Sequence, residues 1–133
     1  MAEKTTYLSP EWRDAVEKKL QGDITPEQMN HLTVSMSNIY KNCPDGKEKY
    51  LFFQVDAGRF TKVLLGEGEP PEAEFRITGD YETFARISQS LLKSQRALMT
   101  GKLKLKGSMV KALKLASIAD RMNKVISEVP TVF

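Results

Sequence analysis

Few side chains in this sequence have the types and spacing that covalent or metal chemistry requires. His31 is the single histidine and Cys43 the single cysteine, and the zinc-binding patterns HExxH and CxxC do not occur. A lone thiol or imidazole without an activating neighbour is more often structural than nucleophilic. The Asp and Glu residues are scattered, and no pair of them is marked out for acid–base work. We therefore expect no enzyme, no bound metal and no cofactor.

Positive charge is concentrated in the C-terminal third of the chain. Between Lys93 and Lys124 there are nine Lys or Arg residues and one acid, Asp120, so this basic block has a net charge of +8. The remainder has 11 basic and 16 acidic residues, a net charge of −5. Such a block attracts an anionic surface, a phosphate-bearing ligand or a nucleic acid, or it is a solvated face.

Apolar side chains are the other candidates, because many of them share one face of the expected strands and helices. One interpretation is a packed core, since Met-rich stripes are usually core; the other is a cavity between sheet and helices that holds an apolar molecule. Under the second interpretation, Lys111 and Lys114 are expected to attract the head group. The predicted ligand-contacting residues are Phe53, Val55, Phe75, Ile77, Phe84, Ile87, Leu91, Met99, Leu103, Leu105, Met109, Leu113 and Met122.

Two periodicities predict the elements that position these side chains. Two-residue alternation is typical of half-buried strands, and three- to four-residue spacing is typical of amphipathic helices. Strands joined by short turns imply antiparallel pairing, with helices on one face. The predicted strands are 32–40, 50–57, 59–65, 73–78 and 102–106. The predicted helices are 9–22, 25–31, 81–92, 94–100 and 109–126. In the last helix, Val110, Ile118 and Val125 lie off the apolar stripe.

A chain of 133 residues favours one domain. We expect it to run over residues 1–133, with N-terminal helices at 9–31, a body at 32–126 and a tail at 127–133. No apolar run approaches the roughly 20 residues that span a bilayer, and the start, MAEKTTYLSPEW, has no apolar core of a secretory signal. A single cysteine fits a reducing compartment, and we expect the protein in the cytoplasm.

The stretch from Ala97 to Leu115 carries a specific motif: Gly-Lys-Leu-Lys, an apolar residue, any residue and Gly, followed by a helix ending in Lys-Leu. These positions are held by Gly101, Lys102, Leu103, Lys104, Leu105, Gly107, Lys114 and Leu115. With the strand-like segments 53–58 and 73–78 and the helix from Asp80, the motif resembles the sterol carrier protein domain, the type-two, non-specific lipid-transfer family. The resemblance covers Thr33 to Leu115. Where that family often has a Gly-Lys loop, this chain has Ser90 to Arg96 without a glycine.

The resemblance implies a five-stranded antiparallel sheet, covered on one side by helices, with an apolar tunnel between them. It also implies binding of fatty acids, fatty acyl-CoAs, phospholipids or sterols with low selectivity. The predicted function is therefore a lipid-binding or lipid-transfer module that touches an anionic membrane transiently and binds no nucleic acid; homodimerisation stays open. One alternative is an accessory subunit for a lipid-metabolising enzyme, with Ile118, Val125 and 130–133 as its contact surface. Another is a nucleic-acid binder that stacks bases on Tyr50 and Phe52.

Overall fold

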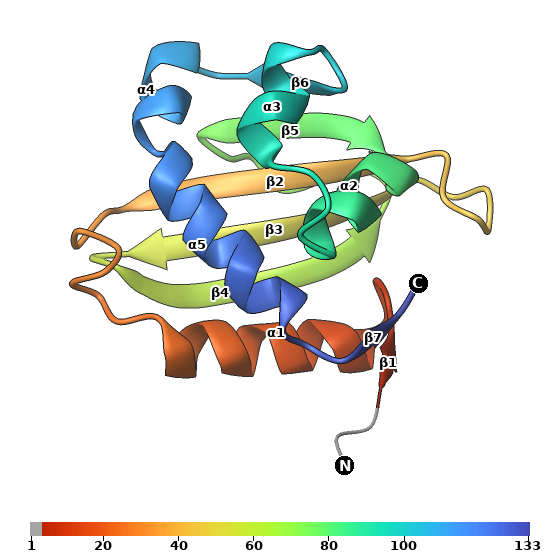
Figure 1. Ribbon diagram of the computed structural model, residues 1–133, viewed down its shortest axis with the longest axis horizontal. Helices are drawn as coiled ribbons and strands as arrows, with labels where there is room; N and C mark the ends of the chain where they lie inside the picture. Colours follow the sequence, from red (N-terminus) through yellow and green to blue (C-terminus); the bar gives the residue numbers. More distant parts are fainter. Residues whose placement is uncertain (1–3) are drawn as a thin grey trace.

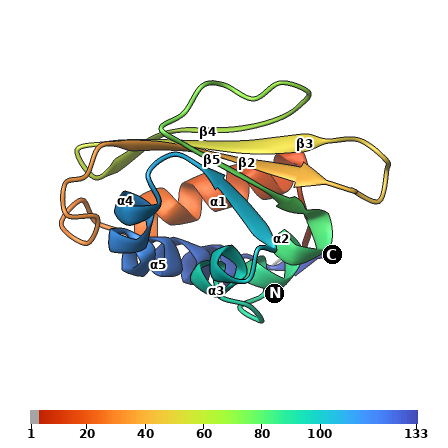
Figure 2. The same cartoon turned by 90° about the horizontal axis from the view of Figure 1, so that it is seen from above.

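A computed structural model describes residues 4–133 and has the predicted α+β architecture, a five-stranded sheet with helices on one face (Figures 1 and 2). Its strands are β1 (Thr5–Thr6), β2 (Val34–Lys41), β3 (Lys49–Asp56), β4 (Arg59–Glu67), β5 (Phe75–Asp80), β6 (Leu103–Lys106) and β7 (Thr131–Val132). Its helices are α1 (Pro10–Asp23), α2 (Tyr81–Ser88), α3 (Ser94–Met99), α4 (Met109–Lys114) and α5 (Ala116–Ser127). All five strands predicted for the sheet are present.

The sheet has the strand order β4-β3-β2-β5-β6, and one of its pairings differs from the prediction. Three neighbouring pairs are antiparallel, but β2 and β5 are parallel. The reason is the loop after β4, which carries the chain from one edge of the sheet to the far side of β2. Figure 2 shows this loop crossing the face away from the helices. The Ser37 hydroxyl on that face donates a hydrogen bond of 3.1 Å to the Pro71 carbonyl and so fixes the loop.

Helix α1 begins where the sequence predicts it. The Ser9 hydroxyl accepts a hydrogen bond of 3.2 Å from the Trp12 amide, and Pro10 occupies the first turn, where its missing N–H costs nothing. Trp12, Val16 and Leu20, spaced by four residues, are buried. The helix lies along β4, where Arg13 Nη1 donates to the Val63 carbonyl at 2.6 Å.

The prediction of a second N-terminal helix at 25–31 is wrong. Its capping interaction forms: the Thr25 amide donates to Gln28 Oε1 at 2.9 Å, and the Gln28 amide donates to Thr25 Oγ1 at 3.1 Å. The segment nevertheless consists of turns, because Asn30 and His31 take positive φ values of 53° and 50° and stop propagation after one turn.

The long helix predicted at 109–126 is two helices that meet at Leu115, the C-cap of α4 and the N-cap of α5. The break changes the direction of the apolar face. Within α5 the buried residues Ile118, Met122, Val125 and Ile126 recur at intervals of four, three and one residues, which is one continuous stripe. Val125 and Ile118 therefore fit a core-facing side once the helix is divided. Helix α4 has no buried residue.

The C-terminal segment predicted as a tail, 127–133, contains strand β7. Strand β7 pairs in parallel with β1, and the Tyr7 amide donates to the Val132 carbonyl at 2.9 Å. The Phe133 ring lies 4.7 Å from the Tyr7 ring, centroid to centroid. The two ends of the described chain therefore close one end of the fold together, as Figure 1 shows.

Candidate functional site

A cavity lies between the helices and the face of the sheet that they cover. The space open to the centre of a water-sized sphere is about 120 Å³, whereas one water needs on the order of 10–15 Å³. From the sheet and the loops before it, the lining residues are Met29, Leu32, Val34, Met36, Asn38, Tyr40, Leu51, Phe53, Val55, Phe75, Ile77, Leu103 and Leu105. From the helices and their caps they are Trp12, Phe84, Ile87, Ser88, Ser94, Gln95, Leu98, Ala112, Leu113, Leu115, Ala116, Ile118, Ala119, Met122, Asn123 and Ile126.

The side chains around this cavity are not fully packed against one another. Met36, Ile77 and Leu105 point to the covered face of the sheet, yet each keeps part of its surface accessible. Leu113 of α4 also lines the cavity and is 41% exposed, so the cavity reaches the molecular surface at α4. Among the residues that the structure describes, none that lines the cavity carries a charge.

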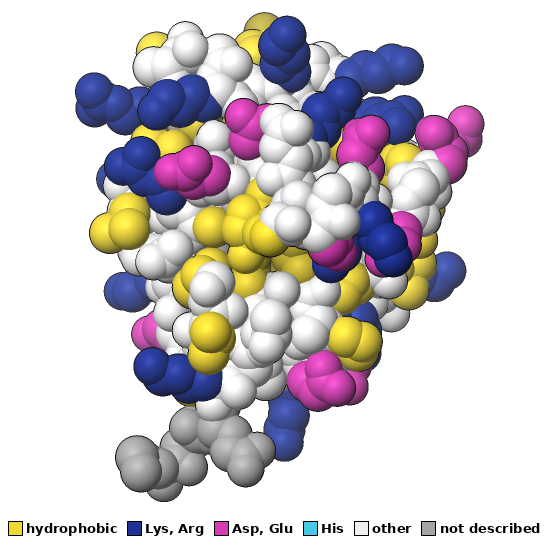
Figure 3. Space-filling view, turned by 90° about the vertical axis from the view of Figure 1, so that its right-hand side faces the viewer, with side chains coloured by type: hydrophobic (Ala, Val, Ile, Leu, Met, Phe, Trp, Pro, Cys, Tyr) yellow, Lys and Arg dark blue, Asp and Glu magenta, His cyan; other side chains and the backbone are white. Residues whose placement is uncertain are grey.

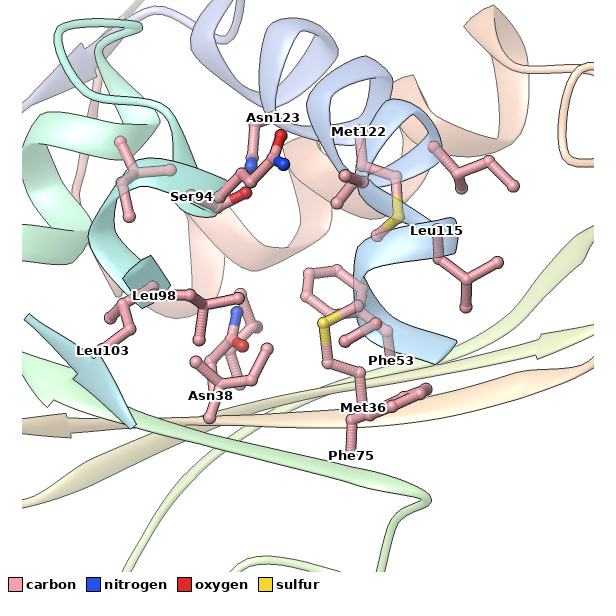
Figure 4. Close-up of a pocket in the computed structure, with 18 of the residues that line it drawn as sticks. Met36, Asn38, Phe53, Phe75, Ser94, Leu98, Leu103, Leu115, Met122 and Asn123 are labelled. Carbon is pink, nitrogen blue, oxygen red and sulfur yellow. The ribbon is translucent and has the colours of Figure 1, made fainter. Parts of the chain in front are cut away.

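The lining changes character along β2. Val34 and Met36 at the start of the strand are apolar, whereas Asn38 and Tyr40 further along carry polar groups. Figure 4 shows Asn38, Ser94 and Asn123 on one side of the space, together with Leu98 and Leu103, and a group of apolar side chains on the other. The apolar group that the figure labels on that side consists of Met36, Phe53, Phe75, Leu115 and Met122.

A buried polar cluster adjoins the polar end. The hydroxyl groups of Tyr7 and Ser88 share a hydrogen bond of 2.9 Å, and the Trp12 ring meets the Tyr7 ring edge-on at 4.9 Å. Burial raises the pKa of the Tyr7 and Tyr40 phenols well above the usual value, so both stay neutral. Trp12 lines the cavity and is 1% exposed, and its indole Nε1–H has no acceptor among the described residues.

The two lysines predicted to attract a head group lie on α4 and differ in their surroundings. Lys111 forms an ion pair with Glu74, which precedes β5, and its Nζ lies 6.0 Å from the centroid of the Phe75 ring. Lys114 is exposed, and no ion pair within the described part of the chain involves it. Lys and Arg side chains gather at the upper end of the face in Figure 3, the level at which Figure 1 places β6, α3 and α4.

Residues 4–133 contain no group of three or more His, Cys, Asp or Glu side chains that could hold a metal ion. Cys43 is a buried free thiol, and burial raises its pKa, which disfavours the nucleophilic thiolate. His31 is exposed at the end of the 25–31 turns. The geometry therefore offers a space for an apolar guest and, among the described residues, no constellation for covalent chemistry.

Comparison with known proteins agrees with this geometry. The family model described as the SCP-2 sterol transfer family matches residues 13–120. The chain belongs to this family. A crystal structure of sterol carrier protein 2 superposes with a TM-score of 0.80 at 25% identity, covering 92% of this chain and 98% of that one. A structure from Thermus thermophilus, described as possibly sterol carrier protein, has a TM-score of 0.78 at 24% identity and shows the same fold; the alignment covers 98% of this chain and 94% of that one.

Two curated relatives place the SCP-2 domain in different contexts. A hydroxysteroid dehydrogenase-like protein 2 from Danio rerio is 33% identical over 107 residues, which are 77% of this chain but 24% of that protein. A non-specific lipid-transfer protein-like 1 from Caenorhabditis elegans is 36% identical over 76 residues, 57% of this chain and 62% of that protein. The match thus spans about a quarter of the dehydrogenase-like relative.

Membership in the SCP-2 family indicates lipid binding or lipid transfer, and a domain of this family is typically a non-catalytic lipid-binding module. Within residues 4–133, no helix is long and apolar enough to cross a membrane.

The structure brings ten of the thirteen predicted contact residues to the SCP-2 cavity and leaves three outside its lining. Leu91, Met99 and Met109 are 64%, 75% and 45% exposed. Leu91 follows α2, which ends at Ser88 and not at residue 92 as predicted, and Ser90 takes a φ of 60° that turns the chain outward. Met99 and Met109 sit at the last and first positions of the short helices α3 and α4. Helical periodicity assigned Leu91 and Met109 to apolar stripes, and Met99 was predicted as an apolar side chain of the short helix 94–100.

The surfaces that the alternative functions would need are buried only in part, since residues 130–133 keep exposed side chains. Ile118 and Val125 pack in the core, so they are not available as a contact surface. Phe52 is also buried, on the outer face of the sheet, so of the two predicted stacking residues only Tyr50 keeps accessible surface. Sequence reasoning missed the polar lining residues, although alternation along β2 had placed Asn38 on the same face as Met36 and Tyr40.

Proposed function

We propose that this SCP-2 chain binds a long acyl chain, as a fatty acid or as the acyl part of an acyl-CoA, in the cavity between sheet and helices. The observation that supports this most is the lining itself, which is apolar over most of its length and, among the described residues, free of charge. Charged head groups then stay outside, where Leu113 brings the cavity to the surface and Lys114 lies one residue away.

The energetics of such binding need no specific polar contact. Burying one methylene stabilises by about 0.8 kcal/mol, so a chain of roughly 16 carbons contributes on the order of 10 kcal/mol. Ordering and association cost several kcal/mol of this. The surplus corresponds to affinity in the micromolar range. The exposed lysines around α4 add attraction to an anionic lipid surface, which supports transient membrane contact during exchange.

Native mass spectrometry of the purified protein tests the proposal, since a co-purified acyl lipid adds its own mass. A fluorescent fatty acid then tests the position of the site. Leu113→Trp should weaken its binding, because the larger ring enters the cavity mouth, whereas Val110→Trp, on the same helix but 66% exposed and outside the lining, should not. Equal binding by wild type and a folded Leu113→Trp protein would refute this placement.

A second role is favoured by the dehydrogenase-like relative, in which the matched region is about a quarter of the protein. We propose that this chain can also present its lipid to a lipid-metabolising enzyme. Size-exclusion chromatography with such an enzyme, with and without fatty acid, would show co-elution if presentation requires a stable complex. If the protein and the enzyme elute separately both with and without fatty acid, presentation through a stable complex is excluded, and lipid binding and transfer remain as the proposed role.

A further inference from the structure

One end of the cavity is lined by polar side chains, which a purely apolar tunnel would not contain. Asn38 rises from β2 while Ser94 and Asn123 extend from α3 and α5 toward the same space (Figure 4). All three side chains are partly buried, so their amide and hydroxyl groups are placed to pair with ordered water or with a polar group of the ligand.

The lining also restricts what that polar group can be. No Lys, Arg or His among the described residues lines the cavity, so an ionised carboxylate or phosphate placed there would lack a counter-charge. Removing an unpaired ion from water costs far more than removing a hydroxyl or a carbonyl. Asparagine and serine side chains can donate to a neutral oxygen and accept from a hydroxyl.

Within residues 4–133, the cavity lining also contains one buried donor without a partner. Trp12 lies beside Tyr7, whose hydroxyl group is already paired with Ser88. The indole Nε1–H is buried and has no acceptor among the described residues, although indole N–H groups usually find one when buried.

We infer that the cavity end opposite α4 is a subsite for an uncharged oxygen-bearing group of the ligand, a hydroxyl or an ester carbonyl, with Asn38, Ser94 and Asn123 as its hydrogen-bonding residues. This inference rests on the proposed function, and it distinguishes two modes of binding. Ligands with an ionised head insert their chain and keep the head at α4. Ligands with a neutral oxygen place that oxygen in the subsite.

Displacement of a fluorescent fatty acid by hexadecanol, methyl palmitate, palmitate and hexadecane tests this subsite in the wild type and in Asn123→Leu. Because each ligand is compared between two proteins, its free energy in water cancels. Asn123→Leu should weaken hexadecanol and methyl palmitate about three- to tenfold, the loss of one neutral hydrogen bond. Palmitate and hexadecane should bind as tightly as to the wild type, or more tightly.

Asn38→Leu, on a strand instead of a helix, is the second variant and should show the same selectivity. Ser117→Leu, on the exposed face of α5 and outside the lining, should change none of the four affinities. If both lining variants weaken palmitate and hexadecane as much as hexadecanol, or leave all four unchanged, the subsite is overturned while the lipid cavity stands. If none of the four ligands displaces the probe from the wild type, the proposed function fails instead.

Discussion

Filling the cavity from α5 should shorten the acyl chain that the protein prefers. Ala119 lines the cavity and keeps accessible surface, so a larger side chain there extends into open space and not into packed atoms. Ala119→Leu adds three carbons, and both residues favour helices, so α5 should form as before. The three carbons displace about three methylenes of the ligand, each worth about 0.8 kcal/mol. Affinity for palmitate should therefore fall by about 2.4 kcal/mol, or roughly fiftyfold.

Displacement titrations with saturated fatty acids of increasing length measure this effect. The optimum length should shorten by about three carbons, and the free energy of unfolding without ligand should not decrease. Ser117→Leu provides the matched control, because it places the same side chain on the exposed face of the same helix. An Ala119→Leu protein with wild-type stability, palmitate affinity and length optimum would refute the assignment of this cavity as the binding site.

Three further predictions concern stability and exchange. Gly58→Ala should lower the free energy of unfolding by more than Gly68→Ala. Both glycines have positive φ (83° and 85°), but only at Gly58 would a Cβ lie 2.7 Å from the Pro26 carbonyl oxygen. Urea titration measures the difference, and equal losses would contradict the clash. Burial raises the pKa of Tyr7 above its value in the unfolded chain, so the neutral phenol contributes its full stabilisation below about pH 10. Above that pH the free energy of unfolding should fall by up to about 1.4 kcal/mol per pH unit from this group. Tyr7→Phe should remove this part of the dependence of unfolding free energy on pH, and an unchanged dependence would argue against burial of Tyr7. Glu74→Gln breaks the ion pair with Lys111 that joins α4 to the start of β5. Because exposed ion pairs contribute at most about 1 kcal/mol, the variant should release a fluorescent fatty acid to vesicles no more than about fivefold faster than the wild type. An unchanged release rate at low salt would exclude this pair as a restraint on α4.

Much of the fold follows from local sequence patterns. Alternation placed the sheet strands, including the Leu103 and Leu105 face of β6, because side chains of a strand point to opposite faces and one face is buried. The caps at Ser9 and Ser108 formed as predicted, since a hydroxyl oxygen needs only the next turn as its partner.

Several of the errors arise where distant contacts override local preference. Nothing local determines that β5 pairs in parallel with β2, because the crossover loop is fixed by Ser37, 34 residues before Pro71 in the sequence. The pairing of β7 with β1 likewise joins the two ends of the chain. The break at Leu115 left a visible signal, the misplaced Ile118 and Val125, which a single helix did not explain.

The candidate site divides in the same way. Its apolar lining residues are conspicuous in the sequence because they share faces with the period of a strand or of a helix. Its polar end requires β2, α3 and α5 to come together, and no spacing within the chain reports that. The exposed residues Leu91 and Met99 were assigned to the lining because helical spacing does not reveal where a short helix stops.

The most direct test of the central claim is an isotope-edited NOE spectrum of the protein bound to uniformly ¹³C-labelled palmitate. We expect contacts between the methylenes of the acyl chain and the methyl groups of Met36, Leu115 and Met122, which line the cavity. Contacts confined to exposed methyl groups such as those of Val110 and Met99, with none to the lining, would contradict it.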